Sequence, residues 1–281
     1  MRPVYDWNQF IAQSFQEDLH EGDHTSLACI PAGAIGIAQL KVKEDGMLAG
    51  VELAEMIAHY FDSELQFDLL IADGSVIKKG DIAFILQGSA RSILSTERLM
   101  LNVMQRMSGI ATLTSKYVQA LEGSKTKILD TRKTTPGMRV LDKLAVRIGG
   151  GMNHRMGLFD MIMLKDNHID FAGGIENAIK KANEYLAKTG KNIGIEVETR
   201  NLNEVERVLA TGGIQRIMLD NFNLDDTRKA VKFIGGRFEV ESSGGINLDT
   251  VRGYAECGVD YISVGAITHQ IQSIDMNLKK V

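Results

Sequence analysis

The sequence predicts an α/β protein that consists of a small α+β layer structure followed by an α/β barrel. Two observations lead to this prediction. Six short aliphatic runs follow one another in the second half of the chain, each ends in a polar residue, and helical stretches separate them. The first part instead shows alternating strands around one helix. Because crossover helices join parallel strands, we expect the second part to close toward a barrel.

The first part shows strand patterns over residues 38–43, 65–71 and 82–88, and a helical pattern over residues 51–61. We also predict one helix within residues 1–30, followed by a polar turn. The segment Gly22–Ser26 has the composition of turns and helix caps. The apolar side of that first helix carries Phe10, Ile11, Phe15 and Leu19.

A long helical pattern starts near Leu94, where Ser95 or Thr96 is the expected cap. Its methionine-rich stripe is typical of core packing rather than of a cofactor site. Arg98 stands beside Glu97 at the start of this helix, so from the residues alone we interpret it as part of a solvent-exposed ion pair. The stripe includes Met100, Val103, Met104, Met107, Ile110 and Ala111.

The six aliphatic runs cover residues 127–133, 161–168, 193–199, 216–221, 238–245 and 261–268. Helical patterns at 201–212, 224–235 and 247–258 follow the third, fourth and fifth runs. In α/β barrels the loops after the carboxyl ends of the strands build the active site, so the polar ends of these runs are the candidate site.

Cations dominate the first strand ends. The first run ends at Asp130, Arg132 and Lys133, a glycine-rich stretch then brings His154 and Arg155, and the second run ends at Lys165, Asp166 and His168. The third and fourth runs end at Glu196, Glu198 and Asp220, carboxylates that suit a divalent ion. The last two end in the loops Ser243-Gly244-Gly245 and Val264-Gly265-Ala266, whose backbone N–H groups can approach an anion.

This layout predicts a ligand with several negative charges, a terminal phosphate and a metal-bound polyphosphate. A sugar phosphate that bears pyrophosphate meets all three conditions. Simpler interpretations stay open for the individual residues: the triple glycine as a flexible turn, Lys133 and Lys165 as solvated strand ends, and Glu198 and Asp220 as structural ion-pair partners.

Composition limits the other possibilities. Lys and Arg total 32 against 36 Asp and Glu, a net charge of -4, which disfavours a nucleic-acid or membrane surface. The two cysteines, Cys29 and Cys257, lack metal-ligand spacing and indicate a reducing compartment. With neither a secretory signal pattern nor a run of about 18 apolar residues, we expect a cytoplasmic protein.

Residues 129–168, LDTRKTTPGMRVLDKLAVRIGGGMNHRMGLFDMIMLKDNH, resemble the signature region of the quinolinate phosphoribosyltransferases, also called carboxylating nicotinate-nucleotide pyrophosphorylases. The segments IEVET, IMLDNF, ESSGGI and VGAITH resemble later motifs of that family in the same order. EDLHEGDHTS, LAGVELAE and ERLMLNVMQRMSGIAT resemble its N-terminal motifs, so the resemblance covers nearly the whole chain.

The resemblance implies a type II phosphoribosyltransferase fold: an N-terminal α/β sandwich with an antiparallel sheet, and an incomplete, seven-stranded α/β barrel. The sandwich would comprise residues 1–108 with the returning segment 270–281, and the barrel residues 109–269. It also implies a homodimer, or a higher oligomer, in which Arg98 of one subunit reaches the site of its partner.

The resemblance further implies the reaction: phosphoribosyl transfer from 5-phosphoribosyl-1-pyrophosphate to quinolinate, with decarboxylation to nicotinate mononucleotide. Mg2+ would bind at Glu198 and Asp220, and no organic cofactor is expected. Lys133, Lys165, Glu198 and Asp220 are the expected catalytic residues. Those four also bind substrate in this interpretation, together with Arg98, Thr131, Arg132, His154, Arg155, Ser243, Gly244, Gly245, Val264, Gly265 and Ala266.

Two alternatives remain at this level. A Schiff-base lyase on the same barrel would use Lys133 or Lys165 as its nucleophile. A noncatalytic or transport-associated nucleotide-binding relative would share the fold without the activity.

Overall fold

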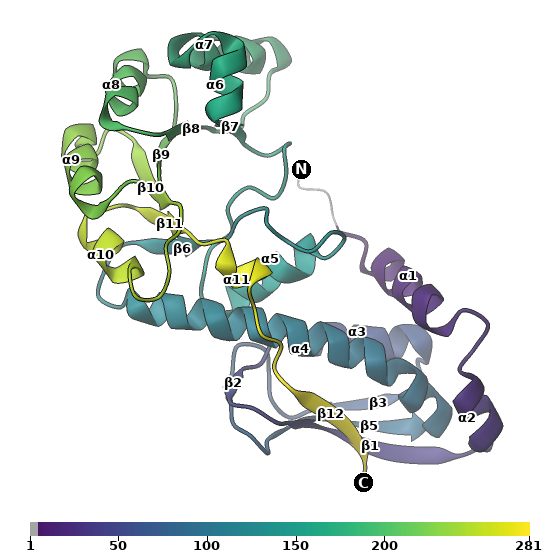
Figure 1. Cartoon of the computed structure of the whole chain (residues 1–281). Coiled ribbons are helices and arrows are strands. Elements are labelled where there is room, and N and C mark those ends of the chain that lie inside the picture. Colours follow the sequence, from purple (N-terminus) through teal and green to yellow (C-terminus); the bar gives the residue numbers. More distant parts are fainter. Residues whose placement is uncertain (1–4) are drawn as a thin grey trace. The chain divides into compact units, whose positions relative to one another are not determined.

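The computed structural model describes residues 5–281, which form two compact units (Figure 1). The first comprises the chain up to Ser115 together with residues 140–150 and 271–281, and the second comprises residues 116–139 and 151–270. Residues 140–150 were expected in the barrel. They belong to the first unit because helix α5 (Arg139–Ile148) is tied to α4 (Ala90–Ala120) there: Arg106 donates to both carboxylate oxygens of Asp142, each at 2.8 Å.

An antiparallel sheet with the strand order β12-β1-β5-β3 forms the first unit. The three strands predicted from alternation are confirmed, and so is the return of the C-terminus to this sheet, because Leu278 of β12 pairs with Leu40 of β1. Two-residue strands at β2 (Gly46–Met47) and β4 (Val76–Ile77) were too short to predict. The sheet consists of β1 (Ile35–Val42), β3 (Gln66–Leu69), β5 (Ile82–Ser89) and β12 (Met276–Lys280).

The helices of the first unit differ from the prediction at two places. Two helices, α1 (Trp7–Leu19) and α2 (His24–Cys29), replace the single expected one, and Asp23 caps the second by accepting from the N–H of Ser26. Helix α4 starts at Ala90, earlier than predicted. Thr96 therefore lies inside α4, where its hydroxyl donates to the carbonyl of Ser92 instead of capping the helix.

The core of the first unit follows the predicted pattern. The methionine stripe of α4 is buried, and Gly50, at the start of α3 (Val51–Phe61), packs against it. Gly50 has φ +97°, and a Cβ there would lie 3.0 Å from the sulfur of Met107. The glycine therefore meets both a backbone and a packing requirement.

The second unit is built on a parallel sheet with the strand order β6-β11-β10-β9-β8-β7. Met152 forms one parallel bridge to Leu129 at the β6 edge, in the place of the expected seventh strand. The seventh member is thus a single bridge residue, and β6 and β7 are the end strands of the regular sheet. The strands are β6 (Lys127–Leu129), β7 (Ile162–Leu164), β8 (Ile195–Thr199), β9 (Arg216–Asp220), β10 (Glu239–Ser243) and β11 (Tyr261–Ser263).

Helices connect these parallel strands, and α8, α9 and α10 follow one another along the outside of the sheet (Figure 1). The three predicted crossover helices are confirmed. Asn201 and Asn223 cap α8 and α9 by accepting the N–H of Glu204 and Asp226. Among residues 5–281, no helix is long and apolar enough to cross a membrane. The helices of this unit are α6 (Asp166–Ala172), α7 (Ile175–Thr189), α8 (Leu202–Thr211), α9 (Leu224–Ile234), α10 (Val251–Glu256) and α11 (Ala266–His269).

Candidate active site at the carboxyl ends of the parallel strands

Strand register brings the predicted polar residues to one end of the parallel sheet. Leu164 pairs with Val197, so Lys165 and Glu198 follow at the same level on β7 and β8. Asp220 pairs with Ser243 across β9 and β10. Ser263 pairs with Leu129, which places Val264 beside Asp130. The carboxyl ends of the six strands therefore lie at one end of the sheet, and the predicted site residues lie there.

Lys165 and Glu198 form an ion pair at this end of the sheet. The Lys165 ammonium lies 2.9 Å from Oε2 of Glu198, with side-chain exposures of 44% and 11%. The N–H of Lys165 donates to Nδ1 of His168, which fixes the junction between β7 and α6. The pair thus combines a partly exposed cation with a carboxylate in a fixed strand position.

Asp220 and the glycine loop after β10 are joined by Asn221, which the sequence analysis did not single out. The Asn221 amide donates to Oδ2 of Asp220 at 2.7 Å, and its backbone N–H donates to the carbonyl of Ser243 at 2.9 Å. Gly244 has φ +99°, and a Cβ on it would collide with the side-chain oxygen of Asn221. Asn221 itself has φ +57°, a conformation that asparagine adopts more readily than most residues. The DN pair after β9 was the available sequence signal.

Lys133 lies against the second predicted glycine loop. Its aliphatic stem approaches Gly265, where a Cβ would lie 3.0 Å from Cδ of Lys133. The hydroxyl of Thr268 donates to the carbonyl of Lys133 at 2.8 Å, and the N–H of Lys133 donates to Thr131 at 3.0 Å. A cation thus stands directly beside the loop expected to hold a phosphate.

Arg155 is mostly buried and lies close to a second cation. Burial lowers the pKa of Arg155, and the positive charge of Arg132 lowers it further. One guanidinium nitrogen donates to the carbonyl of Met161 at 3.3 Å. Two of the predicted cations, Arg132 and Arg155, therefore lie close together.

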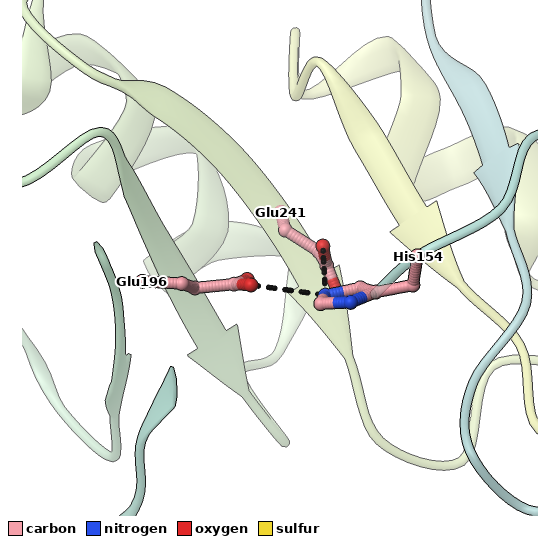
Figure 2. Close-up of side chains that lie close together, drawn as sticks. All are labelled: His154, Glu196 and Glu241. Carbon is pink, nitrogen blue, oxygen red and sulfur yellow. Dashed lines mark ion pairs between the residues drawn. The ribbon is translucent and has the colours of Figure 1, made fainter. Parts of the chain in front are cut away.

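We call the exposed carboxyl ends of the parallel strands, with the loops that follow them, the rim. The side chain of His154 lies beneath the rim and is not part of it. Figure 2 shows its imidazole between two carboxylates from different strands, Glu196 of β8 and Glu241 of β10. Nε2 lies 2.9 Å from Glu196 and 3.3 Å from Glu241, and the histidine side chain is 4% exposed. Arg216 of β9 completes this buried cluster with an ion pair of 3.0 Å to Glu241.

The environment of this cluster favours a proton on Nε2 of His154. Burial opposes the charged imidazole, but the two carboxylates outweigh burial and raise the pKa of His154 to about 9. The N–H of Arg155 donates to Nδ1 at 2.6 Å, so Nδ1 presents its lone pair in this geometry. Both observations place a proton on Nε2, between the carboxylates. Burial, and then the charge of Glu241, raise the pKa of Glu196 to about 7, so this group also holds protons more readily than a free glutamate.

His154, Glu196 and Glu241 also have the spacing of a metal site, because one ligand atom from each lies within 4.8 Å of the others. Arg216 argues against that interpretation, since its guanidinium already pairs with Oε2 of Glu241. Arg216 balances the carboxylate of Glu241, and the raised pKa of Glu196 lets the second carboxyl hold a proton. The cluster therefore meets its charge requirement with protein groups alone.

Sequence reasoning missed two members of this cluster, Glu241 and Arg216. Glu241 lies two positions before the predicted strand end at Ser243, and Arg216 lies four positions before the one at Asp220. This period of two was the available signal. Arg98 is exposed on α4 in the first unit, and its predicted part in a shared site stays a prediction.

The fold defines an α/β-barrel-class domain, and its candidate site lies at the carboxyl ends of the parallel strands. Two family models match the chain. Residues 23–108 match the quinolinate phosphoribosyl transferase N-terminal domain, and residues 110–279 match the C-terminal domain of the same family. The chain belongs to the quinolinate phosphoribosyltransferase family.

Known relatives agree with this assignment. The nicotinate-nucleotide pyrophosphorylase [carboxylating], chloroplastic, of Arabidopsis thaliana is 47% identical over 99% of this chain and 83% of its own length. The probable nicotinate-nucleotide pyrophosphorylase [carboxylating] of Bacillus subtilis is 40% identical over 94% of this chain and 90% of its own length. The crystal structure of nicotinate-nucleotide pyrophosphorylase from Ehrlichia chaffeensis superimposes with a TM-score of 0.91 at 34% identity and covers both chains completely. The predicted α/β fold and family resemblance are confirmed.

Proposed function

We propose that this protein transfers the phosphoribosyl group of 5-phosphoribosyl-1-pyrophosphate to quinolinate and releases pyrophosphate, carbon dioxide and nicotinate mononucleotide. Family membership over both domains is the observation that carries this proposal. The rim supports it chemically, because both substrates are polyanions and Lys133, Lys165 and Arg155 gather at the same strand ends as the two glycine loops.

The first step forms a bond between the quinolinate nitrogen and C1 of the ribose while the C1–oxygen bond to pyrophosphate breaks. Positive charge develops on the ribose, and Glu198 and Asp220 are placed to stabilise it. Lys133 and Lys165 would counter the charge of the departing pyrophosphate. The loops Ser243–Gly245 and Val264–Ala266 would hold the 5-phosphate through backbone N–H groups.

The second step breaks the bond between C2 and its carboxylate. The electron pair stays on C2, where the adjacent nitrogen, now cationic because it bears ribose, stabilises it. A proton from water then completes the product. The protein has to orient the carboxylate out of the ring plane, a task for Arg132 and Arg155 with His154 supporting Arg155 from below, and the chemistry needs no organic cofactor.

Magnesium fits the acidic residues of this rim. Glu198 and Asp220 come from neighbouring strands and point to the same face, because Glu198 pairs with Met218, which lies two residues before Asp220. Each carboxylate has one oxygen engaged by a nitrogen donor, of Lys165 and of Asn221. Oxygen donors of this kind are what Mg2+ prefers. When bound with the substrate, the ion would neutralise charge on the pyrophosphate.

The Schiff-base lyase alternative loses support at Lys165. A nucleophilic lysine must have its nitrogen free to attack, whereas Nζ of Lys165 is engaged by Glu198 at 2.9 Å. Borohydride reduction in the presence of a carbonyl substrate should leave the protein unmodified. The alternative of a noncatalytic relative is tested by measuring turnover, because such a protein would share the fold without the activity.

The direct test incubates the purified protein with Mg2+, 5-phosphoribosyl-1-pyrophosphate and either quinolinate or nicotinate. Carbon dioxide and nicotinate mononucleotide should form from quinolinate, and the yield should fall when EDTA removes the metal. Absence of turnover with both acids, from a protein that is folded by circular dichroism, would contradict the proposal.

We also propose a homodimer, or a higher oligomer built from it, in which Arg98 serves the partner's site. Subunits carrying Arg98→Ala and subunits carrying Lys133→Ala are each expected to be inactive. A mixture that exchanges subunits should regain part of the activity of one site. Mixing that restores nothing would exclude the shared site.

We keep a cytoplasmic location as part of this proposal. The Arabidopsis thaliana relative is named as chloroplastic, so the location is a question for fractionation of the source cell rather than for the family assignment. Recovery of the protein in an organelle fraction would contradict it.

A further inference from the structure

The buried cluster under the rim contains charged groups that the proposed chemistry does not use. Glu196 and Glu241 are fully buried, and the carboxylates of both face the imidazole of His154. Desolvating a carboxylate is costly, and two carboxylates that face the same imidazole repel each other. A sheet interior filled with aliphatic residues would avoid that cost, so the cluster calls for a specific role.

The contacts of His154 indicate what the cluster does. Nε2 faces the two carboxylates, and Nδ1 accepts the N–H of Arg155 at 2.6 Å. Both ring nitrogens are therefore engaged, which fixes the ring in its plane and about its axis. The N–H of His154 donates to Asp130 at 2.8 Å, so the backbone on both sides of the ring is held as well.

Fixing His154 also fixes Arg155. The hydrogen bond to Nδ1 sets the orientation of the peptide from which the Arg155 side chain departs. That side chain reaches the carbonyl of Met161 and lies near Arg132. A displaced imidazole would therefore move a cation at the site where the dicarboxylate binds.

We propose that Glu196 and Glu241, with Arg216 as their counter-charge, are positioning residues for the dicarboxylate subsite. They act through His154, whose ring they hold, on the direction of Arg155. This inference rests on the proposed function, which places Arg132 and Arg155 around quinolinate, with His154 supporting Arg155 from below. It adds a specific consequence: the cluster sets the affinity for quinolinate and leaves the affinity for 5-phosphoribosyl-1-pyrophosphate largely unchanged.

The experiment compares three single variants of the full-length protein. Glu196→Leu removes the acceptor for Nε2–H, whereas Glu196→Gln keeps an oxygen at that position. Glu239→Leu is the matched control, because Glu239 lies on β10 and pairs with Arg216 and Tyr261 outside the contacts of His154. The measurements are KM for each substrate, kcat, and the Kd of quinolinate by calorimetry.

Glu196→Leu should raise the Kd and KM for quinolinate about tenfold or more, the size of effect expected when a buried donor loses its partner. KM for 5-phosphoribosyl-1-pyrophosphate should change less than about twofold. Glu196→Gln should recover most of the loss, and Glu239→Leu should bind quinolinate as the natural protein does. A rise of both KM values by the same factor would instead indicate a purely structural role and overturn the proposal.

A double-mutant cycle tests whether the glutamates act through His154. His154→Asn keeps an acceptor near the position of Nδ1 but has no group at Nε2. In that background, adding Glu196→Leu should weaken quinolinate binding no further. Fully additive losses would show that Glu196 acts by another route, and would overturn the proposal.

Two further measurements keep the outcomes distinct. If Glu196→Leu does not fold, Glu196→Asp withdraws the carboxylate by one methylene and carries the same prediction for quinolinate. A stoichiometric metal ion that is lost with Glu196→Gln would assign the cluster to metal binding and overturn the positioning role.

Failure of the proposed function looks different, because the natural protein itself would then not turn over quinolinate. In that case nitrogen NMR of His154 still tests the cluster. The Nε2–H tautomer should be populated in the natural protein and in Glu239→Leu, and it should be lost in Glu196→Leu. An unchanged His154 signal in Glu196→Leu would overturn the positioning role.

Discussion

Two glutamates on one strand show how burial gives identical side chains different roles. Glu196 and Glu198 lie two residues apart on β8, so both point to the same face of the sheet. Glu198 is partly exposed at the strand end and pairs with Lys165, which is also partly exposed. Glu196 is fully buried below it, beside His154 and within the field of Glu241 and Arg216.

The difference shows why the two carboxylates behave as different chemical groups. Burial and the neighbouring Glu241 raise the pKa of Glu196 to about 7. Glu198 lies at the rim, where solvent and the Lys165 ammonium are within reach. Two positions along β8 thus separate Glu198, which we propose stabilises charge on the substrate, from Glu196, which contacts the protein's own His154.

The largest expected effect is on stability, from removing the cation of the deep cluster. Arg216→Ala should lower the free energy of unfolding by about 3–5 kcal/mol, because it leaves the buried carboxylate of Glu241 without its counter-charge. Thermal or urea unfolding measures this loss. Arg207→Ala is the control, since its ion pair with Glu176 at 2.7 Å is on the surface and should contribute little. If both variants lost the same free energy of unfolding, the buried ion pair would be no more important for stability than the surface one.

The rim carboxylate should show the opposite pattern, with activity lost and stability kept. Glu198→Ala is expected to reduce kcat about a hundred- to a thousandfold, the usual result of removing one preorganised charge from a transition state. Its midpoint of thermal unfolding should stay close to that of the natural protein. Lys133→Ala should behave in the same way. Near-normal turnover in either folded variant would remove the assigned roles.

The glycine loop tests whether the rim depends on backbone shape as well as on charge. Gly244→Ala places a Cβ against Asn221 in a residue with φ +99°, so we expect a destabilisation of about 1–3 kcal/mol and a raised KM for 5-phosphoribosyl-1-pyrophosphate. Gly245→Ala is the matched control, because it shares a positive φ of +63° but has open space around its Cβ position. If the two variants behave alike, backbone strain alone explains the effect and the contact with Asn221 is unimportant.

The last expected effect is the pH dependence of stability that Glu196 contributes. Burial, and then the charge of Glu241, raise its pKa in the folded state to about 7, above the ordinary value of 4.5, so the protonated carboxyl favours the folded state. This contribution is complete below about pH 4.5 and is lost as the pH rises through 7. The midpoint of thermal unfolding should therefore fall less steeply over this interval in Glu196→Gln than in the natural protein. Parallel curves would show that Glu196 does not bind this proton.

Much of the architecture followed from local patterns. Alternation in residues 38–43 identified one antiparallel strand, because one face of it is buried, and residues 65–71 and 82–88 were predicted as strands between turn residues. The crossover helices were visible for the same kind of reason, since α8 and α9 each present one apolar side and begin at an asparagine cap. The single bridge at Met152 was not visible, because one residue carries no period.

The residues of the candidate site also fall into those that local patterns predicted and those that they did not. Lys165, Glu198 and Asp220 were found because each ends an aliphatic run, and the carboxyl ends of parallel strands meet at one edge. Asn221 was not found, because its role depends on contact with Gly244 on the next strand. His154 was predicted at the rim with the other cations, whereas its side chain lies below it.

The sequence by itself determined the α/β class, the order of the strand ends and, through the resemblance, the family. Each of these depends on periodicity and local order along the chain, which the sequence contains directly. Only the tertiary structure decided the depth of each polar residue and its partners across strands, such as Glu196 and Glu241 on either side of His154. Those contacts join residues far apart in the chain, and burial then sets their charge states, so no local pattern specifies them.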